Sequence, residues 1–226
     1  MLTRILLTCS VSGVAAAAIA AGLPVAHVAA EPVSCPDVEV IFARGTGEPA
    51  GLGIAGTGVV GQAFVEALAQ RLNGRTVDAY AVNYPADFDF LAADEGAEDA
   101  AARIATVAAR CPATKIVLGG YSQGAAVIDM LANVGPLGPE IGGIGSAPPL
   151  SAPFADKISA VAVFGNPADR FGTPLSDTGS FAGRAIDLCN SADPICSPQG
   201  DTMKAHEQYQ FAPSDQVAAD FVAARL

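Results

Sequence analysis

One serine of this chain is placed for nucleophilic chemistry. Ser122 has glycine two positions before it and two positions after it, at Gly120 and Gly124, and no other serine does. Glycines at these positions leave room for a strained turn that exposes the serine hydroxyl. An apolar, β-branched segment (114–118) precedes the motif, and a segment typical of a buried helix (125–131) follows it. The pattern predicts a nucleophilic serine at a turn between a buried strand and a helix.

A serine hydroxyl becomes a useful nucleophile only when a base removes its proton, and histidine is a common base. The chain has two histidines, and His27 falls in a segment that we expect to be cleaved off, so His206 is the predicted base. A lone histidine is more often a surface or capping residue. His206 nevertheless follows Ser122 in the order serine, aspartate, histidine that α/β hydrolases use.

The histidine also needs a carboxylate that fixes its tautomer and stabilises the imidazolium. Asp193 is the predicted partner because it follows the last predicted strand and stands between two cysteines that could close a rigid loop. Asp187 lies within the predicted strand and Asp201 lies in a polar loop, so we expect structural or solvated roles for both.

The tetrahedral intermediate of acyl transfer needs hydrogen-bond donors for its oxyanion. The backbone N–H of Gln123, next to the serine at a helix N-terminus, is one predicted donor. The second is expected from Thr46, in a glycine-rich turn (44–47) that follows the first predicted strand, because the first and third strands should be neighbours. The alternative is that the glycines of this turn serve only to bend the chain.

Strands and helices alternate along the rest of the chain, which predicts one α/β domain with a parallel sheet and helices on both faces. The expected strands are 38–43, 77–84, 114–118, 158–164 and 184–188. The expected helices lie around 64–72, over 94–110, from 125 onward and from about 214. A segment rich in Gly, Pro, Ser and Ala (133–154) is expected to be a long loop.

The N-terminal segment has the pattern of a secretory signal peptide. Arg4 precedes an apolar run (5–21), and the small residues 28–30 suit cleavage after Ala30. We therefore expect residues 1–30 to be a signal peptide, residues 31–226 to be a single exported domain, and no membrane span to remain after cleavage. With a net charge of −11 and no basic run, the chain is not expected to bind nucleic acid.

Export to an oxidising compartment favours disulfides among the four cysteines that follow the signal, and four cysteines allow three pairings. Cys35 and Cys111 each precede a predicted strand, so both should lie at the same edge of a parallel sheet. Cys189 and Cys196 would close a small loop around Asp193. We therefore expect Cys35–Cys111 and Cys189–Cys196. The alternative is a metal site, which would usually show histidines and CxxC spacing.

Several stretches together resemble the cutinase-like serine esterase family. They are residues 43–48 (ARGTGE), 120–124 (GYSQG), 189–196 (CNSADPIC), and His206 with Tyr209. The resemblance implies a three-layer α/β hydrolase of flavodoxin-like topology, with a central parallel sheet of about five strands and no lid domain.

The same resemblance implies a catalytic triad of Ser122, Asp193 and His206, with Thr46 and Gln123 as oxyanion donors. Because the sequence has no metal-ligand cluster and no nucleotide-binding motif, we expect that neither a cofactor nor a metal is needed. Fungal members of the family usually carry serine at the position of Thr46, where threonine keeps the same backbone donor.

The expected function is a secreted, monomeric serine esterase, free or associated with the cell envelope. Its substrates would be carboxylic esters with short-to-medium acyl chains, with cutin, polyester or lipid esters as candidates. One alternative is an acetylxylan-type polysaccharide deacetylase, and another is a non-catalytic cell-envelope binding protein on the same fold. Candidate residues for an apolar lining of the acyl site are Leu150, Phe154, Ile195 and Met203, although core packing is the more common role for any one of them.

Overall fold

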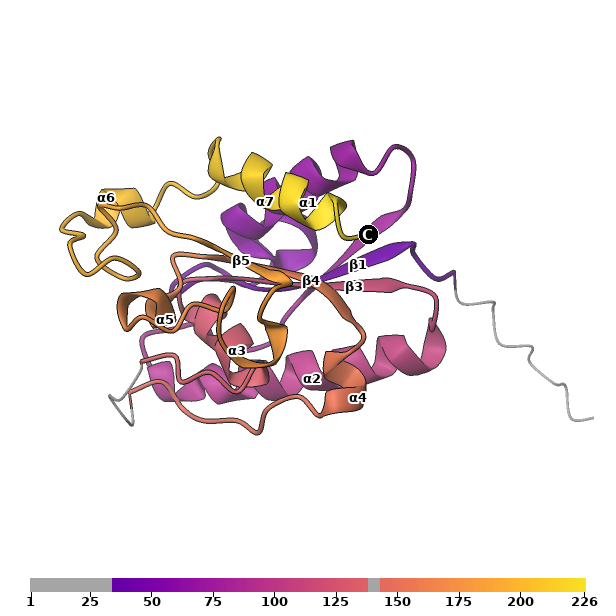
Figure 1. The fold of residues 1–226 in the computed structure, drawn as a ribbon, viewed down its shortest axis with the longest axis horizontal. Coiled ribbons are helices and arrows are strands. Elements are labelled where there is room, and N and C mark those ends of the chain that lie inside the picture. The colour runs from indigo at the N-terminus through magenta and orange to yellow at the C-terminus, as the bar shows by residue number, and fades with distance from the viewer. Residues whose placement is uncertain (1–33, 138–142) are drawn as a thin grey trace, which may run out of the picture. The chain divides into compact units, whose positions relative to one another are not determined.

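A parallel sheet of five strands in the order β2-β1-β3-β4-β5 runs through the middle of the computed structural model, which describes residues 34–137 and 143–226 (Figure 1). Its strands are β1 (Val38–Ala43), β2 (Val77–Ala81), β3 (Lys115–Tyr121), β4 (Ile158–Phe164) and β5 (Ala185–Leu188). All neighbouring strands pair in parallel. The predicted α/β class and its flavodoxin-like strand order are therefore confirmed.

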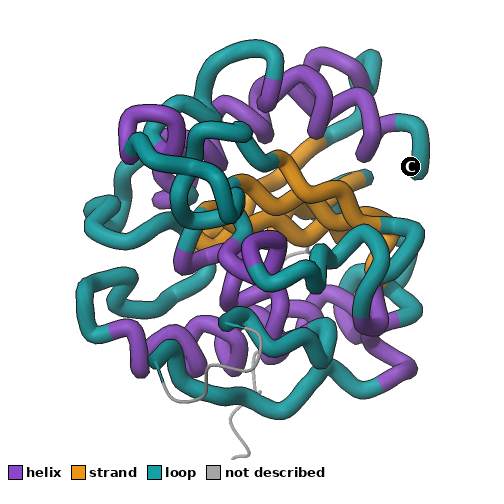
Figure 2. The backbone as a smooth tube through the Cα atoms, turned by 60° about the vertical axis from the view of Figure 1, so that its left-hand side comes forward, coloured by secondary structure: helices purple, strands orange, loops and turns teal. Residues whose placement is uncertain are grey.

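Helices cover both faces of this sheet (Figure 2). The longer ones are α1 (Gly58–Arg71), α2 (Ala93–Arg110), α3 (Gln123–Leu131) and α7 (Ser214–Ala223). The short ones are α4 (Ala152–Ala155), α5 (Pro167–Arg170) and α6 (Met203–His206), with 3₁₀ turns at Ile54–Gly56, Phe90–Ala92 and Gly179–Phe181. Helices α1 and α7 pack together on one face, and α2, α3 and α4 lie on the other (Figure 1).

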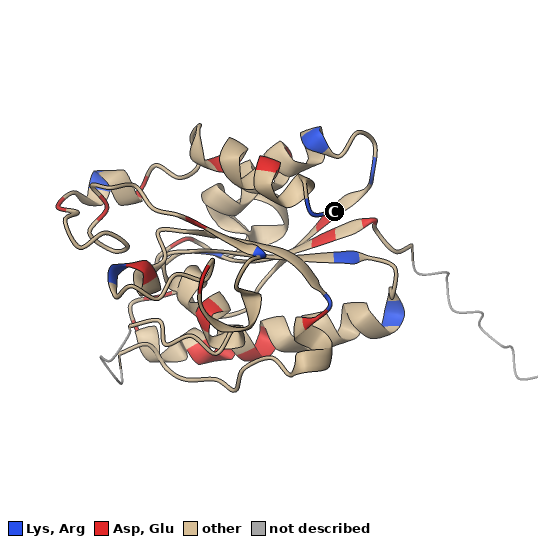
Figure 3. Cartoon of the chain, viewed as in Figure 1, with Lys and Arg blue, Asp and Glu red and all other residues tan. Residues whose placement is uncertain are grey.

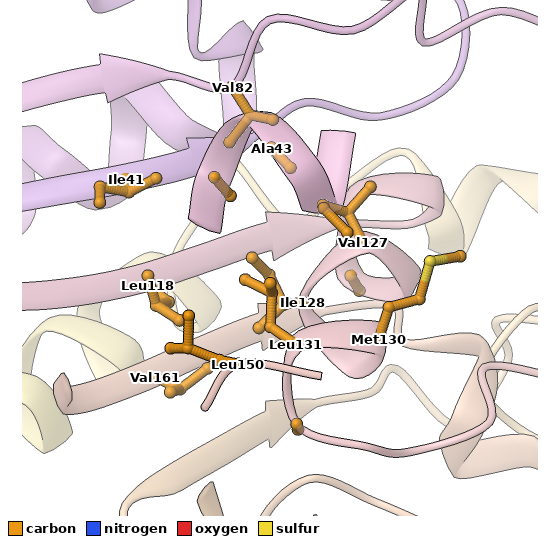
Figure 4. Close-up of a cluster of buried hydrophobic side chains, with 14 of the residues drawn as sticks. Ile41, Ala43, Val82, Leu118, Val127, Ile128, Met130, Leu131, Leu150 and Val161 are labelled. Atoms are coloured by element: carbon orange, nitrogen blue, oxygen red, sulfur yellow. The ribbon is translucent and has the colours of Figure 1, made fainter. Parts of the chain in front are cut away.

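Alternation along the strands divides the hydrophobic core into two clusters, one on each face of the sheet. In β1, Ile41 contributes to the cluster under α2 and α3, whereas Phe42 contributes to the cluster under α1 and α7. Figure 4 shows the first cluster, with side chains from the sheet packed against those of α3. Helix α3 is buried along its whole length, so the serine that precedes it is held by a rigid element.

The second strand ends earlier than predicted, at Ala81 rather than near Tyr84. The guanidinium of Arg44 donates hydrogen bonds to the carbonyl oxygens of Val82 (3.4 Å) and Tyr84 (2.7 Å). These carbonyls therefore bond to a side chain instead of extending the sheet. Helix α4 is likewise a short helix within the segment that was expected to be a loop.

Charges on α2 follow the helix dipole, with Asp94 and Glu95 in the first turn and Arg110 in the last (Figure 3). Within 34–137 and 143–226, no helix combines the length and the apolar character needed to cross a bilayer. The predicted signal peptide, residues 1–30, lies outside the described residues, so it remains a prediction.

Candidate active site

The predicted nucleophile lies at a sharp turn between β3 and α3. Ser122 adopts φ 56° and ψ −117°, a backbone conformation that non-glycine residues rarely occupy. A side chain on Gly120 would overlap the backbone carbonyl of Gly124, and one on Gly124 would overlap the carbonyl of Ala43. The two glycines are therefore required because the first turn of α3 packs directly on β3 and β1.

The three residues of the predicted triad lie within hydrogen-bond distance of one another. The Nε2 atom of His206 is 2.8 Å from Ser122 Oγ, and its Nδ1 atom is 2.7 Å from Asp193 Oδ2. Asp193 is fully buried and His206 is 4% exposed. The Oδ1 atom of Asp193 accepts a hydrogen bond from the backbone N–H of Ile195 at 2.7 Å.

The environment of Asp193 favours its charged form. Burial alone opposes the charge, but hydrogen bonds from His206, Tyr209 and the backbone of Ile195 outweigh it and hold the pKa of Asp193 below its usual value. The site thus keeps a carboxylate next to His206, where it can stabilise an imidazolium.

A disulfide and an arginine are among the connections that hold the loop carrying Asp193. A disulfide joins Cys189 to Cys196, with their Cα atoms 5.8 Å apart. The guanidinium of Arg170, in α5, donates to the carbonyl oxygens of Pro194 (2.8 Å) and Ser197 (2.7 Å). The loop is therefore tied to α5 as well as closed on itself.

The residues expected to supply the oxyanion donors also meet. The hydroxyl of Thr46 is 3.2 Å from Gln123 Oε1, so the glycine-rich turn after β1 touches the start of α3. Glu48 holds that turn, because its carboxylate accepts hydrogen bonds from the N–H groups of Gly45 (2.7 Å) and Val59 (2.8 Å). Among the described residues, neither the backbone N–H of Thr46 nor that of Gln123 has a hydrogen-bond acceptor. Both are available to a ligand.

A cavity of about 530 Å³ opens over Ser122 and His206. Its apolar walls are formed by Phe88, Phe90, Leu137, Ile144, Ile195 and Met203. Two of the four predicted lining residues, Ile195 and Met203, are among them. Two others, Leu137 and Ile144, belong to the glycine- and proline-rich segment 133–154.

The prediction that Leu150 and Phe154 line this cavity is wrong. Leu150 is buried in the core beside Leu131 and Val161 (Figure 4), and its N–H donates to the carbonyl of Leu131 at 3.0 Å. Phe154 lies in α4 and borders a separate groove along α2. The chain from Leu150 onward packs against α2 and α3, which directs both side chains away from the serine.

Two important lining residues, Phe88 and Phe90, were not identified from the sequence. They follow β2, and their rings are 6.3 Å apart at the mouth of the cavity. Phe88 is 80% exposed. Two aromatic residues alternating with aspartates (87–90) directly after a predicted strand were an available signal, because loops after parallel strands commonly form binding sites.

The structure places the remaining predicted residues as follows. A second disulfide joins Cys35 to Cys111, so both cysteine pairs are the expected ones. Asp187 accepts hydrogen bonds from the backbone of Leu175 and Ser176, which is a structural role, and Asp201 is exposed. In the part of the chain that the structure describes, no cluster of His, Cys, Asp and Glu side chains could hold a metal ion.

A parallel sheet covered by helices, with serine, histidine and aspartate in hydrogen-bond contact at its carboxyl edge, is the arrangement of the α/β hydrolase class. Within that class, the chain belongs to the cutinase family. The family model described as Cutinase matches residues 34–226.

Individual relatives agree with this assignment. The chain is 50% identical over 216 residues to the protein named Phospholipase Culp4 of Mycobacterium tuberculosis, covering 94% of this chain and 90% of that protein. A Trichoderma reesei cutinase in complex with a phosphonate inhibitor is 34% identical, with a TM-score of 0.64, over 84% of this chain and 76% of that structure. The catalytic core domain of an acetyl xylan esterase from Trichoderma reesei is 26% identical, with a TM-score of 0.71, over 85% of this chain and all of that structure.

Proposed function

We propose that the protein is a secreted serine esterase that hydrolyses carboxylic esters through an acyl-enzyme on Ser122. One observation carries the proposal: Ser122 Oγ, His206 and Asp193 form a continuous chain of contacts of 2.8 and 2.7 Å at the base of an apolar cavity. Membership of the cutinase family supports the same conclusion, since relatives are named carboxylesterase and cutinase.

The geometry supports a two-step mechanism. His206 takes the proton from Ser122 Oγ as that oxygen attacks the ester carbonyl, and Asp193 stabilises the imidazolium that forms. The N–H groups of Thr46 and Gln123 donate to the oxyanion of the tetrahedral intermediate. His206 then gives its proton to the departing alcohol, and a water molecule, activated by the same histidine, releases the acid.

The lining of the cavity supports esters with short-to-medium acyl chains. An acetyl group would leave most of the apolar wall without contact, whereas a longer chain would bury its methylene groups there, at about 0.8 kcal/mol for each. The exposed rim side chains Phe88 and Met203 suit substrates presented by a lipid or polyester surface.

A second candidate is removal of acetyl groups from a polysaccharide such as xylan. It is supported by the likeness to acetyl xylan esterases, which extends over 85% of this chain. The apolar lining favours the first candidate, because a polysaccharide offers few apolar groups to contact it.

The test is a series of p-nitrophenyl esters, from acetate to palmitate, assayed alongside acetylated xylan. We expect the highest kcat/KM for chains of intermediate length, low activity on xylan, and a loss on the order of 10³-fold or more in Ser122→Ala. Near-native turnover in Ser122→Ala would exclude the mechanism. Activity confined to acetate and acetylated xylan would instead favour the second candidate.

Export and a monomeric state are part of the same proposal. Two disulfides suit an oxidising compartment, and residues 1–30 have the pattern of a signal peptide. N-terminal sequencing of protein from the culture medium tests cleavage after Ala30, and light scattering tests the monomer.

A further inference from the structure

We propose that Tyr209 is a positioning residue of the active site, which holds Asp193 beneath His206 and shares the carboxylate oxygen that the histidine uses. The inference rests on the proposed catalytic roles of Asp193 and His206, and it adds a fourth member to their hydrogen-bonded chain.

The position of the phenol hydroxyl is the first argument. Tyr209 OH donates to Asp193 Oδ2 at 2.7 Å, and this is the same oxygen that lies 2.7 Å from His206 Nδ1. The other oxygen, Oδ1, is occupied by the N–H of Ile195. Tyr209 and His206 therefore both form hydrogen bonds with the same carboxylate oxygen, so a change in one bond alters the strength of the other.

A second hydrogen bond fixes the direction of the phenol proton. The backbone N–H of Asn190 donates to Tyr209 OH at 2.9 Å, and an N–H group can only donate. The phenol oxygen is therefore the acceptor in that bond. Its one proton is directed to the Asp193 carboxylate at 2.7 Å, which is a stronger acceptor than the other contact of the hydroxyl, the disulfide sulfur of Cys196 at 3.4 Å. The Tyr209 hydroxyl therefore donates a hydrogen bond to the Asp193 carboxylate.

Packing shows that Tyr209 joins separate parts of the site. The residue is fully buried, and its ring lies 6.1 Å from the ring of His206, 6.0 Å from Tyr121 and 6.2 Å from Phe164. Its hydroxyl reaches the disulfide loop through Asn190 and Asp193. One side chain therefore contacts the core, the segment that carries the histidine and the loop that carries the aspartate.

Burial of the phenol, and then its hydrogen bond to Asp193, keep it protonated. Burial and then the hydrogen bond to Asp193 raise the pKa of Tyr209 far above its usual value. Tyr121, the other phenol beside the ring, is also kept neutral, because burial and the charges of Glu48, Asp193 and Glu207 raise its pKa. Tyr209 is thus a neutral donor throughout the pH range in which the enzyme would work.

Loss of the phenol donor should change the pH dependence of activity, which loss of packing alone would not do. Without the phenol, Asp193 Oδ2 has one fewer hydrogen bond and attracts the imidazolium proton more strongly. As the pH is lowered, the variant lacking the phenol should therefore lose activity at a higher pH than the wild-type enzyme does.

The experiment compares Tyr209→Phe with Tyr80→Phe over the pH profile of kcat/KM. Tyr80 is a matched control, because its hydroxyl also lies 3.0–3.1 Å from a carboxylate, that of Asp99, far from the serine in sequence and on another element. In Tyr209→Phe we expect kcat/KM to fall roughly 10-fold and the acidic limb to move to higher pH by about half a pH unit or more. Tyr80→Phe should keep the wild-type limb.

Proton NMR tests the same bond without any substrate. The low-field resonance of the His206 Nδ1–H proton should move further downfield in Tyr209→Phe, because its bond to Asp193 strengthens. An unmoved limb together with an unmoved resonance would overturn the proposal and leave Tyr209 a packing residue. Failure of the esterase proposal is separate, since it would appear as an inactive wild-type protein.

A second variant covers the case in which Tyr209→Phe fails to fold. Incorporation of 3-fluorotyrosine at position 209 keeps the ring and makes the hydroxyl a stronger donor. It should move the acidic limb to lower pH, opposite to the effect of phenylalanine. An unchanged limb, or a move in the other direction, would overturn the proposal.

Discussion

Single residues of the site depend on how closely backbone segments approach one another. Gly120 and Gly124 have no room for a side chain, because carbonyl groups of Gly124 and Ala43 lie where a Cβ atom would be. Gly45 has the same constraint from the ring of Tyr121. The turn after β1 and the turn after β3 are therefore pressed together, which brings Thr46 beside Gln123.

We predict that the hydroxyl of Thr46 contributes to stabilising the oxyanion. It contacts Gln123 Oε1, while Gln123 Nε2 is buried without a partner among the described residues. Exchange of the amide oxygen and nitrogen would let Nε2 donate to the hydroxyl and direct the hydroxyl proton at the oxyanion. Thr46→Val should then lower kcat by on the order of 10- to 100-fold, whereas Thr46→Ser should stay within a few-fold of the wild type. Steady-state kinetics checks this, and wild-type kcat in Thr46→Val would mean that only the backbone donates.

Among the elements, α5 connects the catalytic loop to a buried group of carboxyls. The amide of Asn166, just before α5, contacts Asp129 (3.0 Å) on α3 and Asp187 (3.2 Å) on β5. Asp169, within α5, lies close enough to Asp187 for the two carboxyl groups to interact, and the Arg170 guanidinium donates to the carbonyl oxygen of Pro194 in the loop of Asp193. Helix α5 thus lies between the buried carboxyl groups of Asp129 and Asp187 and the disulfide loop that carries Asp193.

This arrangement predicts a pH dependence of stability. Burial, and then the charge of Asp187, raise the pKa of Asp169 from 3.8 to about 8. Between these values the folded state holds a proton that the unfolded state has lost, so the contribution to stability falls as pH rises from about 4 to about 8 and is constant above that. Asp169→Asn removes the charge and keeps a donor for Asp187.

The expected result is that Asp169→Asn loses less stability than the wild type between pH 5 and pH 8, by a few degrees in Tm. Thermal unfolding followed by circular dichroism at both pH values measures it. The exposed Asp177 provides a control, since Asp177→Asn should parallel the wild type. Equal slopes for Asp169→Asn and the wild type would show that Asp169 is ionised in the folded state.

Across the whole molecule, the candidate site and the Cys35–Cys111 disulfide lie at opposite ends of the sheet. Thr46, Ser122 and Asp193 each follow a strand, β1, β3 and β5 respectively, so they meet at the carboxyl edge. At the opposite end, Cys35 and Cys111 precede β1 and β3 and are joined by a disulfide with a sequence separation of 76. The proposed catalytic residues therefore lie at one end of the sheet, and the Cys35–Cys111 disulfide lies at the other.

The disulfides should therefore differ in effect. Loss of the Cys35–Cys111 pair, which closes the longer loop, should lower the free energy of unfolding by on the order of 4 kcal/mol, and loss of the Cys189–Cys196 pair by about 2 kcal/mol. The second loss should reduce kcat/KM more, because it frees the loop of Asp193. Denaturant unfolding and ester kinetics of the two double-serine variants check both parts. The reverse order for activity would mean that Arg170 and Tyr209 alone hold the loop.

Local signals in the sequence were sufficient for much of the fold. Apolar periodicity and helix ends predicted the strands and the longer helices, because these depend on neighbouring residues. The residues proposed as triad and oxyanion donors also come together in the structure. Errors arose at Leu150 and Phe154, where the direction of a side chain depends on how segment 147–155 packs against α2. Phe88 and Phe90 were missed although their position after a predicted strand was an available signal, because the sequence alone did not show that their loop lies beside Ser122.

The residues proposed to react, and their order along the chain, could be predicted from the sequence alone. The spacing of Gly120, Ser122 and Gly124 is typical of a tight turn that leaves no room for larger side chains. His206 is the one histidine that follows this turn in the sequence. Only the tertiary structure decided which side chains line the cavity and that Tyr209 shares the oxygen of Asp193 used by the histidine. Such contacts join residues on separate loops, and close packing, which no local pattern encodes, sets their distances.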